Sequence, residues 1–187
     1  MKKLLFLLLV LNVQCTIPNV VCAGERGAAD QDFIAQMMEH VSSKQAIYAA
    51  SDYQSVTVSP TMINYVIDMI GNDDQGLLEG SSAQDQQLFK QLLKNVKSLR
   101  IFTASSNIDK YTALAKQLLG KNKHTYKEFA AKDQLGDSKR IWTRQSNNNV
   151  VEIILLDQGT GQGKPMQILN LTGNFGDNFF ETLMQIK

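Results

Sequence analysis

The last third of the sequence alternates between apolar and polar residues, and this alternation constrains the fold more than any other feature. Four segments show it, at residues 126–131, 140–145, 150–156 and 166–172. The stretches between them, QLGDS, SNNN and DQGTGQGKP, have compositions typical of turns. Because short connections join antiparallel neighbours, the sequence predicts a four-stranded antiparallel meander at the C-terminal end.

The loop between the second and third of these strands decides which side chains face each other. An odd-length loop centred on Asn148 places Arg144 opposite Glu152. The same loop places Trp142 opposite Ile154, whereas an even-length loop breaks both pairs. An ion pair and an aromatic pair with a β-branched residue each stabilise a sheet, by about 1 kcal/mol at most. We therefore predict the register of the odd-length loop.

Helical periodicity dominates the chain before the meander. Ser59 followed by Pro60 is typical of a helix start, and Ser106 begins a pattern typical of a capping box. Apolar residues recur at helical spacing over 33–41, 62–70, 88–96 and 111–119, and again at Phe179, Phe180, Leu183 and Met184. Two further segments, Tyr53–Val58 and Leu99–Ala104, alternate between the two sides as strands do. Amphipathic helices packed with a largely antiparallel sheet define an α+β domain.

The N-terminal segment has the features of a secretory signal peptide. Two lysines precede the apolar run LLFLLLVL, which is too short to cross a bilayer. Small residues at Val21 and Ala23 favour cleavage between Ala23 and Gly24. The alternative is a lipoprotein acylated at Cys15 or Cys22, although neither cysteine follows the small residue that such a site usually has. We expect residues 1–23 to be removed and the protein to be periplasmic, or lipid-anchored in the outer membrane in the alternative.

Residues 24–187 are long enough for a single domain with its own core. They contain no cysteine, and loss of the two N-terminal lysines changes the formal net charge from +1 to −1. A near-neutral chain lacks the broad basic surface that nucleic-acid binding requires. We therefore expect no nucleic-acid partner, and membrane attachment only if the chain is lipidated.

No motif in the sequence predicts a catalytic, metal or cofactor site. The glycine-rich stretch 159–164 has Gln158 where a phosphate-binding loop needs glycine, and a strand follows where that loop needs a helix. The two histidines, His40 and His124, have no cysteine partners after residue 23, so the pattern does not suggest a zinc site. No GxSxG motif is present, and a hydrolytic enzyme is the alternative that requires residues to converge only in the fold.

The best candidate for an interaction surface is the strand segment with Arg140, Trp142 and Arg144. These residues alternate along the strand and so share one face of the sheet. Tryptophan and arginine are enriched at binding hot spots, which favours an interface. The structural alternative is a tryptophan packed under a helix with arginines at its rim.

Several phrases of the sequence resemble the bacterial family named domain of unknown function 4252. They are DFIAQMMEHV, VTVSPTMINYVIDMI, KNVKSLRIFTAS, QLLGK, YKEFAAK, VVEIILLD and ILNLTGNFGDNFFETL, and they follow a signal peptide. The resemblance extends from about Asp30 to Lys187. It implies an exported or lipid-anchored protein of Gram-negative envelopes with no established enzyme activity. Some members are encoded beside extracytoplasmic-function sigma factors.

The expected function is therefore that of a non-enzymatic cell-envelope domain. Its partner is expected to be an unidentified envelope protein or a small ligand. The alternative that the family neighbourhood implies is a regulatory component of envelope stress, linked to a sigma factor.

Overall fold

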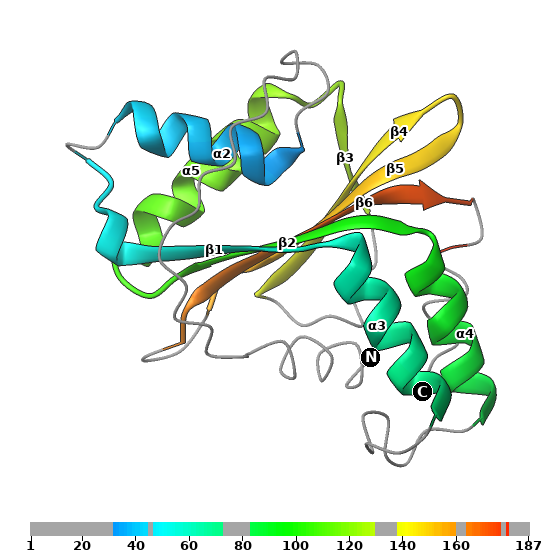
Figure 1. Cartoon of the computed structure of the whole chain (residues 1–187). Helices are drawn as coiled ribbons and strands as arrows, with labels where there is room; N and C mark the ends of the chain where they lie inside the picture. The colour runs from blue at the N-terminus through cyan, green and yellow to red at the C-terminus, as the bar shows by residue number, and fades with distance from the viewer. Residues whose placement is uncertain are drawn as a thin grey trace.

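The computed structural model describes residues 32–44, 47–72, 83–129, 138–159, 164–176 and 179. In this part of the chain, six strands form one antiparallel sheet that lies between two pairs of helices (Figure 1). The strands are β1 (Tyr53–Val58), β2 (Val96–Ala104), β3 (Tyr126–Phe129), β4 (Lys139–Ser146), β5 (Asn149–Asp157) and β6 (Met166–Phe175). The α+β class predicted from the sequence is confirmed.

The strand order is β1-β2-β6-β5-β4-β3, so β1 and β3 form the two edges of this sheet. Strands β3, β4 and β5 each pair with the next strand along the chain, which confirms the predicted four-stranded meander. Strands β5 and β6, which precede and follow the glycine-rich stretch, are antiparallel neighbours, whereas residues 160–163 of that stretch lie outside the described residues. Strand β2 pairs with β6 and joins the N-terminal elements to the meander.

Each face of the sheet carries one helical layer and one apolar core (Figure 1). Helices α2 (Phe33–Ser43) and α5 (Ile108–Lys121) pack on the first face of the sheet. Helices α3 (Pro60–Asn72) and α4 (Ala83–Lys94) pack on the second face. A short 3-10 helix, η1 (Ala50–Asp52), precedes β1. The first core is built from Phe33, Ile34, Met37, Phe102, Tyr111, Ile154 and Ile168, among others, and the second from Ile63, Leu92, Leu99, Ile153, Leu169 and Phe175, among others.

Helix α3 starts as the sequence predicts. The hydroxyl of Ser59 accepts a hydrogen bond from the amide of Met62 at 3.3 Å, and Pro60 is the first helical residue. Serine thus satisfies one of the amides that a helix leaves free at its start.

Two local expectations are wrong because contacts with distant residues decide the conformation. Val96 begins β2 instead of ending a helix. Helix α5 has Asn107 as its N-cap instead of Ser106, and this asparagine has a left-handed backbone with φ of 51° and makes no side-chain cap. Its amide nitrogen Nδ2 donates to Oδ2 of Asp52 at 2.8 Å, which fixes the loop before α5 to η1. The closing helix lies outside the described residues except for Phe179, which packs in the second core.

The hairpin between β4 and β5 turns at Asn147 and Asn148. Their φ values of 50° and 65° are both positive, as a two-residue type I′ turn requires. Ser146 therefore lies opposite Asn149 across an even-length loop. The prediction of an odd-length loop is therefore wrong.

A β-bulge nevertheless produces the two side-chain pairs from which the odd-length loop was predicted. Arg144 lies opposite Glu152, and Trp142 lies opposite Ile154, because the register shifts between Arg144 and Gln145. One extra residue in β5 thus changes the register by one position. The predicted pairs are confirmed, but their cause is the bulge.

Candidate functional site

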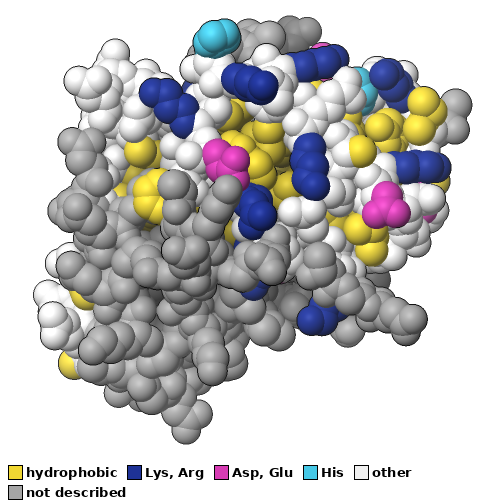
Figure 2. Space-filling model, turned by 180° about the vertical axis from the view of Figure 1, so that it is seen from behind, with side chains coloured by type: hydrophobic (Ala, Val, Ile, Leu, Met, Phe, Trp, Pro, Cys, Tyr) yellow, Lys and Arg dark blue, Asp and Glu magenta, His cyan; other side chains and the backbone are white. Residues whose placement is uncertain are grey.

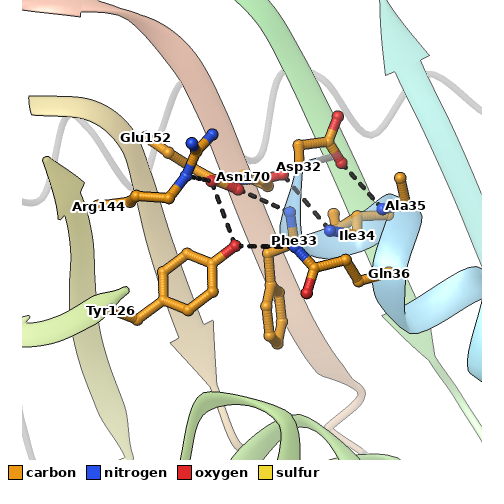
Figure 3. Close-up of polar contacts among 9 residues, drawn as sticks. All are labelled: Asp32, Phe33, Ile34, Ala35, Gln36, Tyr126, Arg144, Glu152 and Asn170. Carbon is orange, nitrogen blue, oxygen red and sulfur yellow. Dashed lines mark hydrogen bonds and ion pairs between the residues drawn. The ribbon is translucent and has the colours of Figure 1, made fainter. Parts of the chain in front are cut away.

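The most unusual polar group in the described structure is the carboxylate of Glu152. This residue lies in the middle of β5, and its side chain points to the sheet face that carries α2 (Figure 3). Its exposed fraction is 0%. A buried carboxylate is costly unless several hydrogen bonds compensate for its lost hydration.

Four donors surround this carboxylate (Figure 3). Oε1 accepts hydrogen bonds from the backbone amide of Phe33 and from Nδ2 of Asn170, both at 2.7 Å. Oε2 accepts from Nε of Arg144 at 2.7 Å and from the hydroxyl of Tyr126 at 3.3 Å. Strands β3, β4 and β6 and helix α2 therefore each contribute one donor to a single side chain of β5.

The same group of residues binds the start of helix α2. The amide of Phe33 donates to Glu152, the amide of Ile34 donates to Oδ1 of Asn170 at 3.5 Å, and the amide of Ala35 donates to Oδ1 of Asp32 at 2.9 Å. These three amides are among the four that a helix leaves free at its N-terminus. Negative charge near this end also matches the helix dipole. Glu152 thus acts as a cap that comes from the sheet.

Asp32 extends this group of residues toward β2. Its Oδ2 lies 3.1 Å from Nε of Arg100, and the Arg100 side chain is one-third exposed. The group is therefore most exposed at Arg100, whereas Arg144 is 20% exposed and Glu152 itself is closed to solvent.

Tyr126 remains neutral within this group. Burial and the negative charge of Glu152 raise the pKa of Tyr126 well above its ordinary value of 10. The neutral hydroxyl donates to Glu152 and accepts from Nε2 of Gln36 at 3.3 Å. The hydroxyl of Tyr126 therefore joins helix α2 to the buried carboxylate.

We expect the free energy of unfolding to fall as the pH rises above 10. Burial, together with the charge of Asp52, raises the pKa of Tyr111 from 10 to about 12, and the pKa of Tyr126 is also raised. Below pH 10 these tyrosines keep their protons in both states and contribute no pH dependence. Above it the unfolded tyrosines lose protons that the native ones keep, so each lowers stability by about 1.4 kcal/mol per pH unit. Urea unfolding at pH values between about 9 and 11 measures the slope of the free energy of unfolding against pH. Tyr126→Phe should make this slope shallower. An unchanged slope in the variant would contradict the contribution of Tyr126.

The structure places the three interaction candidates on one face of β4, as their spacing predicts. Arg144 binds the buried Glu152, and Nε of Arg140 lies 3.6 Å from Oε1 of Glu128. Trp142 is half-buried against the first core. Figure 2 shows the side of the molecule away from the viewer of Figure 1, where Lys and Arg side chains gather with hydrophobic side chains between them. Arg144 thus has a structural role. That the β4 face with Arg140, Trp142 and Arg144 binds a partner stays a prediction.

Residues 48–179 match the family model described as Domain of unknown function (DUF4252). The chain belongs to the DUF4252 family. The comparisons with curated proteins and with solved structures give no match. The family resemblance seen in the sequence is thus confirmed.

Helix α2 of this DUF4252 protein precedes the matched residues, yet it is part of the same core. Phe33, Ile34 and Met37 are fully buried, and the start of the helix binds Glu152 and Asn170 inside the matched region. The folded unit of this DUF4252 protein therefore includes residues from at least Asp32.

The Arg144–Glu152 pair was predictable from the sequence, but the rest of the group around it was not. Tyr126, Asn170 and Asp32 come from three other parts of the chain. The available signal was a polar residue flanked by apolar residues in each of two strands, Glu152 in VVEIILL and Asn170 in ILNL. Buried polar residues of this kind need partners.

The histidines do not converge on a metal-binding cluster within the described residues. His40 packs its ring against Tyr48, and burial and the nearby Lys44 and Lys121 lower the pKa of His40. No group of three or more His, Cys, Asp or Glu side chains in the described ranges could hold a metal ion.

The predicted processing residues Cys15, Cys22, Ala23 and Gly24 lie outside the described residues. Their cleavage and lipidation stay predictions. In the ranges that the structure covers, no helix has the length and apolar character needed to span a membrane.

Proposed function

We propose that this DUF4252 protein is an exported cell-envelope protein that binds a partner protein without catalysing a reaction. We further propose that the partner binds along the outer edge of β1. The observation that carries this proposal is the concentration of exposed apolar side chains around that strand.

Strand β1 is an edge strand whose central residues have exposed side chains on both faces of the sheet. It pairs with β2 on one side, and residues 54–57 are all exposed. An edge strand presents backbone donors and acceptors that a further strand can pair with. Addition of a strand to such an edge is a common way to bind an extended peptide or a second sheet.

The opposite edge has features that oppose such pairing. Strand β3 has four residues, of which Lys127 and Glu128 are charged and exposed. Short length and exposed charge are the means by which proteins protect an edge strand. Strand β1, with the sequence YQSVTV, has no charged residue and no proline. The contrast favours β1 as the binding edge.

The large hydrophobic side chains that are exposed in the described structure lie in one continuous part of the chain. They are Ile47, Val56, Met62 and Tyr65, with exposed fractions between 48% and 65%. They belong to β1 and the segments directly before and after it. Large apolar side chains that are exposed on and beside an edge strand favour this region as a protein-binding surface.

The proposed location is supported by the N-terminal sequence alone. Two lysines followed by an apolar run and small residues before Gly24 match a signal peptide that is cleaved after Ala23. Intact-mass spectrometry of the protein purified from its native host tests this. A chain that begins at Gly24 is the expected result, and an acylated chain that begins at Cys15 or Cys22 would show a lipid anchor instead.

A photo-crosslinking amino acid at single positions tests the binding surface in living cells. Thr57 is an exposed position on β1, and Glu128 lies on β3 directly opposite Trp142, so it samples the second candidate surface with Arg140. We expect a specific protein adduct from position 57 and none from position 128. Adducts from position 128 alone would move the binding surface to β4, and no specific adduct from either position would overturn the proposed binding function.

A further inference from the structure

We propose that the strand added to β1 is the β1 of a second copy of this chain, which makes the protein a two-fold symmetric dimer with one continuous sheet. This inference rests on the proposed use of the β1 edge for binding. It names the partner and fixes the register.

Symmetry limits the registers that two copies of β1 can adopt. In an antiparallel pair of strands, two residues directly opposite each other form either a hydrogen-bonded pair or a non-hydrogen-bonded pair. Successive residues of a strand alternate between these two classes, so the two-fold axis must pass beside a residue that faces its own copy. Near the middle of β1 this residue is Ser55 or Val56.

Side-chain chemistry favours the axis at Val56. This axis places Val56 opposite Val56 of the second copy and Ser55 opposite Thr57. The axis at Ser55 would place the amide of Gln54 opposite Val56 instead. Pairs of β-branched residues and pairs of hydroxyl residues stabilise neighbouring strands. The axis at Val56 also covers an apolar side chain that is 48% exposed in one copy.

The charges and the faces of the sheet are compatible with this pairing. Because β1 has no charged side chain, the paired strands bring no like charges together. Val58 packs in the second core with α3, and Val56 shares its face because it lies two positions earlier. A two-fold axis normal to the sheet returns each face to itself. The α3 helices of both copies, with exposed Met62 and Tyr65, therefore lie on the same side as the Val56 pair.

Disulfide crosslinking tests the register. The test uses the full chain with Cys15 and Cys22 replaced by serine. In the proposed dimer, Val56→Cys places two cysteines directly opposite each other with their Cα atoms about 5 Å apart, a distance that suits a disulfide. The control Gln54→Cys places its thiol four positions from its own copy, about 13 Å away along the strand. We expect a covalent dimer from Val56→Cys under mild oxidation and none from Gln54→Cys. The reverse result, or equal crosslinking of both, would overturn the register.

Light scattering during size-exclusion chromatography tests the dimer itself. The unmodified chain should have twice the mass of the monomer, and Val56→Lys should be a monomer, because lysine on an edge opposes strand pairing. Its far-UV circular dichroism should equal that of the unmodified chain, which shows that the variant is folded. A monomeric unmodified chain, or a dimer that persists in Val56→Lys, would overturn the inference. A position-57 crosslink to a different protein would overturn it as well, yet would support the proposed binding function.

Discussion

Replacing Glu152 with leucine should lower the free energy of unfolding by about 3–5 kcal/mol, the cost of breaking a buried ion pair from one side. The substitution removes the acceptor for four donors at once. Arg144 would keep its positive charge with its side chain only 20% exposed and without its carboxylate partner. Nδ2 of Asn170 and the amide of Phe33 would lose acceptors in a region closed to water.

The chain provides a matched control on the same sheet. Glu128 also pairs with an arginine of β4, Arg140, but its side chain is 46% exposed. Exposed ion pairs of this kind contribute about 0–1 kcal/mol, so Glu128→Leu should change stability by less than about 1 kcal/mol. Chemical unfolding followed by the fluorescence of Trp142, which packs against the first core, measures both variants. Equal effects of the two substitutions would show that burial does not set the energy of the Glu152 contacts.

Gly173→Ala should be the second most damaging of these changes, with a loss of about 3 kcal/mol. A Cβ atom at Gly173 would overlap the backbone carbonyl oxygen of Asn95 and lie 2.8 Å from Cζ of Phe175. The carbonyl cannot easily move away, because it accepts a hydrogen bond from the amide of Asn174 at 3.1 Å. Phe175 is fully buried in the second core, so its ring cannot turn toward solvent.

Gly120→Ala is the matched control for this second prediction. Gly120 lies near the end of α5, and a Cβ atom there would meet nothing within 4 Å. Alanine is the better helix former, so this substitution should raise stability by up to about 1 kcal/mol. Urea unfolding of the two variants gives both values. A Gly173→Ala protein as stable as the unmodified chain would show that the contact between β6 and Asn95 can relax.

The meander could be predicted from the sequence because its evidence is local. Each strand alternates with a period of two, and turn residues separate the strands. The pairing of Arg144 with Glu152 also follows from a short segment. The bulge that produces this pairing could not be inferred, since the sequence only shows that the two side chains suit each other.

The site around Glu152 could not be predicted because its partners are far apart in the sequence. The donor Phe33 is 119 residues from Glu152, and Ile34 is 136 residues from Asn170. No periodicity relates residues at such distances. The same limit explains the start of α5, where Asn107 binds Asp52 across 55 residues in place of the local capping box.

The cap that the sheet provides for α2 has a consequence for the timing of folding. Helix α2 is among the first described residues to be synthesised, but its acceptor Asn170 comes 136 residues after Ile34. At a synthesis rate of about 5–20 residues per second, the helix waits roughly 7–27 s for this partner. The first core cannot close earlier, because β6 supplies part of it. In an exported protein, as proposed, the delay would keep the chain unfolded until nearly all of it had been made.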